Sequence, residues 1–364
     1  MTLPGAVELA IGAALIAAAL YDLFQSVVLP RPAVGRVRIS PTVLRLAWRA
    51  WRAVAIRPRR LQLREGALAT FAPLAVIGLL LLWGFSLILG YGLLYHVLGD
   101  QLQPRPDGFG TTIFYSTGQM LSFSVDGIDA HGTAVRLLTA MEAATGFALF
   151  ALVISLLFSL FSAFQRRESA VVALDALAGA PPSGVQLLEN CAKHHMPDQL
   201  VATFAEWRSW TVDVLESHLS YPLLFYFRSS HDNEAWSNSF GAVMDAASLV
   251  ICAVEGGPEG PAHLMNKVGD HLVTDIGRYY RVDAEPYSAV EREEFVEACR
   301  RLRDAGYAVR DGEEPWHRFA QLRSGYAPSV DRLSRVLALP PAPWIGDRSY
   351  LPHRAVRRRP RRAK

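Results

Sequence analysis

Two long uncharged runs constrain this chain more than any other feature of its sequence. No Asp, Glu, Lys or Arg occurs from Phe71 to Leu98, and none occurs from Ala143 to Gln165. A helix needs about 20 apolar residues to cross the hydrocarbon core of a bilayer, and each run is longer than that. The two runs therefore predict two membrane-spanning helices.

A third apolar segment, from Pro4 to Leu29, predicts an extra N-terminal span. Ala, Leu and Ile fill most of it without a turn signal, although Glu8 and Asp22 interrupt it. A signal peptide would begin with basic residues, and none precedes Arg31, so a retained helix is favoured over a cleaved one. A carboxylate inside a span is costly, and we expect Asp22 to pair with an arginine at the membrane interface.

Arginine placement predicts the topology of these spans. Arginines are dense between Leu29 and Gly66 and again directly after the last span, whereas the loop between the second and third spans carries almost none. Cytoplasmic segments beside spans are enriched in Lys and Arg. We therefore expect a multi-pass protein of the inner (plasma) membrane, with its N-terminus outside and its C-terminus in the cytoplasm. The arginines on which this depends are Arg31, Arg36, Arg38, Arg45, Arg49, Arg52, Arg57, Arg59, Arg60, Arg64, Arg166 and Arg167.

The basic cytoplasmic segment contains a predicted amphipathic helix from Pro41 to Ile56. Three arginines, Arg45, Arg49 and Arg52, share one narrow face at 3.6 residues per turn, and Trp, Val and Ala cover the remainder. Arginine and tryptophan on such a helix suit the membrane interface. The alternative is a helix that packs on the soluble part of the protein.

Cysteine usage agrees with the predicted topology. Cys191, Cys252 and Cys299 all follow the last span, and no pair of them has metal-ligand spacing. An odd number of widely separated cysteines predicts free, buried thiols in a reducing compartment.

The segment from Gly108 to about Gly132, between the second and third spans, does not look like an ordinary loop. Its first half, GTTIFYSTGQMLSF, carries no charge, and its apolar residues recur at helical spacing. A stretch of this length is too short to span a bilayer and is a candidate for a re-entrant helix. The polar residues SVDGID that follow suit backbone that lines a water-filled cavity or is buried in protein.

The layout of span, short helix, polar segment and span resembles the potassium-channel superfamily, in particular the bacterial two-span ion-channel proteins. The resemblance covers about residues 70 to 167. It implies a passive cation channel in the lipid bilayer, built as a homotetramer because one filter segment per chain requires four chains around an axis. The residues that carry it are Tyr115, Ser116, Ser122, Ser124, Val125, Asp129, Arg136, Glu142, Ala144, Thr145 and Gly146.

The sequence departs from the family at the selectivity filter, where the family pattern is Thr-Val-Gly-Tyr-Gly-Asp. In the same frame, Asp126 and Ile128 replace both glycines, and an isoleucine would be strained in the left-handed backbone that a filter glycine adopts. A slip of one residue would align Gly127 with the second glycine but would lose the aspartate of the frame. The expected filter residues are Ser124, Val125, Asp126, Gly127, Ile128 and Asp129.

Two interpretations of this altered filter remain open. In a tetramer, Asp126 and Asp129 would each form a ring of four carboxylates, which favours cations, monovalent or divalent, without potassium selectivity. Alternatively, the filter no longer conducts, and the protein is a channel-like membrane receptor or anchor that acts through its cytoplasmic part. In the last span, Gly146 is a candidate gating hinge. The stripe of Ser155, Ser159 and Ser162 lines the pore or serves helix packing.

The cytoplasmic part predicts helices and no recognisable chemistry. It offers no nucleophile–base pair, phosphate-binding loop or metal-ligand spacing, so neither an enzyme nor a cofactor is expected, and no nucleic-acid partner. The arginine-rich tail is expected to be disordered, either solvated or in contact with anionic lipid. The predicted helices are Gln186–His195, Asp198–Leu219, Glu234–Val254, Ala262–Tyr280 and Ser288–Ala305.

The sequence thus predicts an all-α membrane protein. Its pore-loop transmembrane domain would carry an extra N-terminal span and be followed by a helical cytoplasmic domain. The expected divisions are residues 1–30 (first span), 31–66 (basic segment), 67–167 (pore domain), 168–345 (helical cytoplasmic domain) and 346–364 (basic tail).

Overall fold

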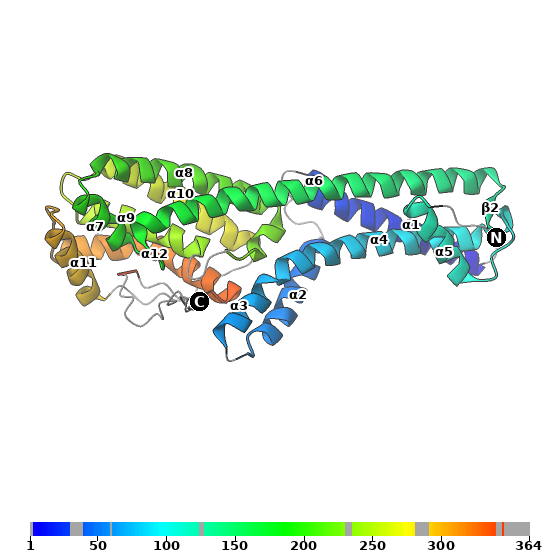
Figure 1. Ribbon diagram of the computed structural model, residues 1–364, viewed down its shortest axis with the longest axis horizontal. Coiled ribbons are helices and arrows are strands. Elements are labelled where there is room, and N and C mark those ends of the chain that lie inside the picture. The colour runs from blue at the N-terminus through cyan, green and yellow to red at the C-terminus, as the bar shows by residue number, and fades with distance from the viewer. Residues whose placement is uncertain are drawn as a thin grey trace, which may run out of the picture. The chain divides into compact units, whose positions relative to one another are not determined.

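A computed structural model of the chain describes residues 3–29, 39–58, 60–123, 127–229, 235–280, 291–339 and 344–345. Helices dominate these residues, as the sequence predicts (Figure 1). Three of the helices are long and apolar enough to cross a membrane: Pro4–Val27, Gln62–Val97 and Thr133–Ala178. They coincide with the three predicted spans.

The chain divides into two compact units. The first unit comprises Met1–Arg166 and Glu216–Arg228, and the second comprises Arg167–Leu215 and Ser229–Lys364. The first unit contains α1 (Leu3–Leu23), α2 (Ile39–Ala55), α3 (Leu61–Ala69), α4 (Phe71–Val97), β1 (Leu102–Gln103), α5 (Phe109–Met120), β2 (Asp129–Ala130), most of α6 (Thr133–Ala178) and a 3-10 helix, η3 (Pro222–Tyr226). The second unit contains the end of α6, α7 (Gly184–Lys193), most of α8 (Pro197–Ser220), α9 (Trp236–Cys252), α10 (Glu259–Tyr280), α11 (Arg292–Asp304) and α12 (Glu313–Leu337).

Helices α1 and α4 pack together in antiparallel fashion through two glycines. A Cβ atom at Gly90 would lie 2.7 Å from Cγ1 of Ile16 and 2.9 Å from the carbonyl oxygen of Gly12. Near one end of the pair, His96 Nδ1 lies 2.7 Å from Glu8 Oε2. Small residues at a helix crossing let two backbones approach closely, which favours association inside a membrane.

Asp22, near the other end of this pair, is buried and finds neutral donors. Trp83 Nε1 donates to Asp22 Oδ2 over 2.9 Å. The backbone N–H of Ser40, in the first turn of α2, donates to Asp22 Oδ1 over 3.1 Å, and the Ser40 hydroxyl also donates to Asp22. The expectation of an arginine partner is therefore wrong for the described part of the chain. The reason is that the start of α2 offers the carboxylate an unsatisfied backbone donor, as helix N-termini do.

The amphipathic helix α2 starts two residues earlier than predicted and packs by one face. Trp48 is buried, with its ring centroid 4.9 Å from that of Phe71 and 5.5 Å from that of Tyr226. The apolar side chains of Val43 and Val54 are nevertheless exposed. The helix thus packs on the protein by one face and presents apolar side chains outward on another. Its place at a membrane interface stays a prediction.

Helix α4 is also antiparallel to α6. The hydroxyl of Tyr91 lies 3.2 Å from Thr145 Oγ1, and Tyr95 donates to Thr139 Oγ1 over 3.4 Å.

The two short strands pair antiparallel, with Leu102 opposite Ala130 and Gln103 opposite Asp129. Figure 1 shows α5 and β2 at the end of this unit where α4 finishes and α6 begins.

The second unit is a helical bundle around α9. Every residue of α9 is buried, and α7, α10 and α12 pack against it. A Cβ atom at Gly184 would lie 2.6 Å from the carbonyl oxygen of Ala242, and one at Gly269 would lie 2.2 Å from Sδ of Met244. Glycine at these two sites lets α7 and α10 approach α9 closely.

Helices α7 to α11 match the five predicted helices, with ends that differ by up to four residues. Helix α12 was not predicted, because Pro328 and Gly325 lie inside it and both residue types normally interrupt a helical pattern. Its buried side chains nevertheless recur at helical spacing. They are Phe319, Tyr326, Val330, Leu333 and Leu337.

Replacement of Gly90 by alanine tests the close crossing of α1 and α4. The new methyl group would overlap Ile16 and Gly12, and overpacking of this kind typically costs about 1–3 kcal/mol. We expect a lower melting temperature in detergent for Gly90→Ala. The matched control is Gly84→Ala on the same helix, where no atom lies within 4 Å of the added Cβ. If the two variants melt alike, the proposed crossing is wrong.

The three cysteines are free and buried, as expected, which predicts slow thiol labelling. Burial raises the pKa of Cys252 to about 12 and that of Cys299 to about 11. At pH 7.5 both thiols are protonated and shielded, and only the thiolate reacts with maleimide. Maleimide should therefore label the wild-type cysteines only as the protein unfolds. In the Gln321→Cys variant, the added cysteine lies at an exposed position and should be labelled at once. Fast labelling of the native wild type would contradict the packing.

Candidate functional site

The short helix α5 ends abruptly at Met120. The N–H of Phe123 donates to the carbonyl oxygen of Gly118 over 3.0 Å, and the N–H of Ser122 donates to that of Gln119 over 3.2 Å. Ser122 has a left-handed backbone, with φ of 57°. This hydrogen-bond pattern is the Schellman motif, which ends a helix and redirects the chain. The 12-residue helix is thus too short to cross a bilayer and releases the chain immediately after Met120.

A buried contact between Ser116 and Glu142 fastens α5 to α6. Ser116 Oγ lies 2.5 Å from Glu142 Oε1 and 2.9 Å from the carbonyl oxygen of Ile88, in α4. A serine hydroxyl carries one proton, so both contacts are hydrogen bonds at once only when Glu142 is protonated and donates to Ser116. Glu142 is 0% exposed, and no described residue forms a hydrogen bond with its Oε2 atom. The neutral acid also fits this site because an unpaired buried carboxylate is costly.

Tyrosine side chains surround this contact and join the same three helices. The rings of Tyr95 and Tyr115 meet edge to face, with centroids 5.0 Å apart. Both hydroxyls lie 3.4 Å from Thr139 Oγ1 on α6. The arrangement fixes α5 between α4 and α6 by directional bonds, in addition to apolar packing.

Gly146 is the point of closest approach between α6 and the end of α5. A Cβ atom at Gly146 would lie only 2.1 Å from the carbonyl oxygen of Met120. On the α4 side, a Cβ at Gly92 would lie 2.5 Å from Cδ1 of Ile113. The sequence suggested that Gly146 is a gating hinge. The structure adds a second reason for glycine at this position, because a side chain would collide with Met120 even if α6 never bends.

The predicted filter residues are described only in part. Ser124, Val125 and Asp126 lie outside the described residues. Gly127 is exposed and has the left-handed backbone, with φ of 88°, and Ile128 is not among the residues with positive φ. The left-handed position thus coincides with the glycine. The strain anticipated for the isoleucine does not arise.

Ile128 and Asp129 return the chain from this segment to α6. Ile128 is half-buried against the cluster that contains Tyr91, Tyr95 and Tyr115. Asp129 is exposed in β2 and pairs with Gln103. Asp129 therefore lies exposed within the two-stranded sheet, directly before the turn into α6.

Two polar residues hold the turn into α6. Arg136 Nε donates to the carbonyl oxygen of Ala130 over 3.0 Å. Gln101 accepts at its backbone carbonyl from the N–H of His131 over 3.0 Å. Sequence reasoning identified Arg136 through the family resemblance but missed Gln101 and the pairing of Ser116 with Glu142. A lone carboxylate inside a long apolar helix was the available signal for that pairing.

Helix α6 exposes an apolar stripe along much of its length. From Phe147 onward the exposed side chains lie three or four residues apart, whereas Leu156, Leu160 and Ala163 on another face are buried. Of the predicted serine stripe, Ser155 is exposed, and Ser162 accepts a hydrogen bond from Arg166 Nη1 over 2.7 Å. The members of the exposed stripe are Leu137, Met141, Phe147, Phe150, Ile154, Phe158 and Phe161.

Comparison of the chain with protein-family models, with curated proteins and with solved structures finds no match. Function therefore has to be argued from the residues and their geometry. The geometry is a short helix held by polar contacts between two antiparallel apolar helices, followed by a polar segment that contains Gly127 and Asp129.

Variants of the Ser116–Glu142 contact test the protonation of Glu142. In Glu142→Gln the amide can donate to Ser116 as the acid does, so we expect a free energy of unfolding within about 1 kcal/mol of wild type. Ser116→Ala leaves the buried acid without its partner and should cost about 1–3 kcal/mol. The control is Ser86→Ala, which removes only a bond to Leu82 within α4. Equal losses in Ser116→Ala and Ser86→Ala, measured by detergent melting, would contradict a special role for the contact.

Proposed function

We propose that the chain is one subunit of a passive cation channel. The observation that carries the proposal is the 12-residue helix α5, which ends abruptly beside α6 and leads into a polar segment. Backbone of this kind at membrane depth is tolerated where it lines a water-filled cavity or is buried in protein. The resemblance of this part of the sequence to the potassium-channel superfamily supports the same function.

The proposed channel is a homotetramer in the lipid bilayer. One chain contributes one polar segment, and a filter built from rings requires several copies around an axis. The exposed stripe of α6 gives each subunit a large apolar face that lipid or neighbouring subunits can cover. The arginine distribution supports an inner-membrane orientation in which α5 and β2 face outward and the second unit lies in the cytoplasm.

Selection in this channel would depend on carboxylates. Asp129 is exposed in β2, and in a tetramer it would form one ring of four acidic side chains. Asp126 would form a second ring in the same short segment. Acidic rings favour cations over anions, and they can also bind divalent cations. Potassium preference is not part of the proposal, because the filter glycines are replaced.

The second candidate function is a non-conducting receptor or anchor that acts through the second unit. The observation in its favour is that Asp126 and Ile128 stand where the family has glycine. The same electrical measurement distinguishes the two candidates.

Recording from the purified protein in planar bilayers tests conduction. We expect cation-selective currents, and we expect Asp126→Asn and Asp129→Asn to shift the reversal potential in a salt gradient toward that of a non-selective pore. The cause is the loss of four negative charges from a ring in each variant.

The matched control is Asp107→Asn, which removes an exposed carboxylate from the loop before α5. This variant should conduct and select like wild type. Absence of any current from the wild-type protein would favour the receptor or anchor function. Currents unaffected by both filter variants would show that the carboxylate rings do not select the ions.

A further inference from the structure

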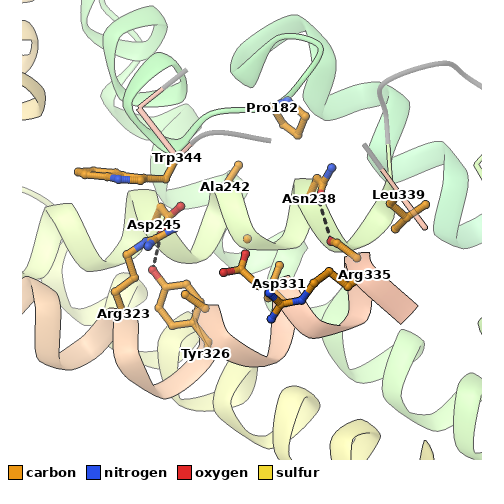
Figure 2. A pocket seen from close by; sticks show the side chains of 14 residues that line it. Pro182, Asn238, Ala242, Asp245, Arg323, Tyr326, Asp331, Arg335, Leu339 and Trp344 are labelled. Carbon is orange, nitrogen blue, oxygen red and sulfur yellow. Dashed lines mark hydrogen bonds and ion pairs between the residues drawn. The ribbon is translucent and has the colours of Figure 1, made fainter. Parts of the chain in front are cut away.

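The second unit has an open cavity between α9 and α12 that is lined by both charged and apolar side chains. Its volume is about 330 Å³, near the lower end of the range for small-molecule sites. Figure 2 shows its walls, with Asp245 and Asn238 on α9, and Arg323, Tyr326, Asp331 and Arg335 on α12. Asp245 is buried, and a buried charge is costly unless it is paired, whereas Asp331 and Arg335 are exposed side chains on the lining.

Asp245 is a buried carboxylate that bonds through only one of its oxygens to the part of the chain that the structure describes. Arg323 Nε donates to Oδ1 over 2.9 Å, and the hydroxyl of Tyr326 donates to the same atom over 2.6 Å. No donor from the described residues reaches Oδ2. Asp245 is only 4% exposed. A buried carboxylate normally accepts hydrogen bonds at both of its oxygens. The open oxygen is therefore a place for a donor from a ligand.

Asp331 supplies a second carboxylate from the facing helix. Its side chain points into the space between α9 and α12 in Figure 2, and it makes no hydrogen bond or ion pair with the described residues. Burial raises the pKa of both Asp245 and Asp331, although the Arg323 guanidinium lowers both, and the charge of Asp331 raises the pKa of Asp245. A cationic group with several N–H donors would relieve both carboxylates together.

Two guanidinium groups balance the charge of the cavity. The guanidinium carbon of Arg323 lies 5.4 Å from the ring centroid of Trp344. Arg335 lies one helical turn beyond Asp331 on α12 and faces the same cavity. Two aspartates and two arginines leave the lining neutral, so a ligand with one positive and one negative group preserves neutrality.

Trp344 forms a fixed wall of the cavity. Its backbone oxygen accepts from Ser183 Oγ over 3.0 Å, and its indole N–H donates to Glu294 Oε2 over 2.9 Å. The ring also packs against Phe319, with centroids 5.1 Å apart. The wall offers an apolar surface to the uncharged part of a ligand.

We propose that this cavity binds a small zwitterion that carries an ammonium and a carboxylate, as a free α-amino acid does. The ammonium donates to Asp245 Oδ2 and to Asp331, and the carboxylate binds the guanidinium of Arg335. A metal ion fits less well, because the described residues contain no group of three His, Cys, Asp or Glu side chains that could hold one. The site is independent of ion conduction by the first unit.

The test is calorimetric titration of the full-length protein in detergent with each of the common L-amino acids. We expect saturable binding of at least one of them. For that amino acid, its N-acetyl derivative and its decarboxylated amine should each bind at least about tenfold more weakly, because each lacks one charged group. Binding of the amine alone as tightly as the amino acid would overturn the zwitterion assignment.

Two variants locate the binding at this cavity. Asp331→Asn and Arg335→Gln should each weaken the best amino acid by at least about tenfold. The control is Glu314→Gln, a similar change at an exposed position on the same helix, which should bind like wild type. The proposal fails if no amino acid binds at millimolar concentration, or if both cavity variants bind as tightly as the control.

Discussion

The contact between Ser116 and Glu142 is the constraint on which the arrangement of the first unit depends. It joins the middle of a short helix to a helix long enough to span a membrane, and it does so away from solvent. An apolar contact would allow α5 to slide or rotate, whereas a short hydrogen bond fixes both its depth and its rotation. The polar segment after α5 begins from a position that this bond defines.

Glycines make the remaining close contacts possible. At Gly90 and Gly146 a side chain would collide with backbone or side-chain atoms of the facing element. Inside a bilayer, burial of apolar surface does not by itself drive helices together, so close backbone approach and hydrogen bonds carry much of the packing. Glycine also permits close helix packing in the second unit, where Gly184 lies against α9.

The second unit contrasts with the first in where its charge lies. The first unit buries the carboxylate of Asp22 against neutral donors and the neutral acid of Glu142 against the Ser116 hydroxyl. In the second unit, Asp245 lies in the middle of a fully buried helix and faces an arginine, a tyrosine and a cavity. A well-packed apolar residue would stabilise such a bundle at least as well. The charged cavity is therefore better understood through what it can bind than through what it adds to stability.

The sequence by itself determined the three apolar helices, the short helix between the second and third, and, of the helices from α7 onward that the structure describes, all but α12. These features depend on local pattern: length of an apolar run, helical spacing and positions of turn residues. Tertiary structure decided the partners of Asp22, the pairing of Ser116 with Glu142, the left-handed site at Gly127 and the cavity beside Asp245. Each of the pairings joins polar atoms from separate helices, and no local pattern encodes which donor meets which acceptor. Helix α12 lies between these cases, because tertiary burial of its apolar stripe outweighed the local signal of Pro328.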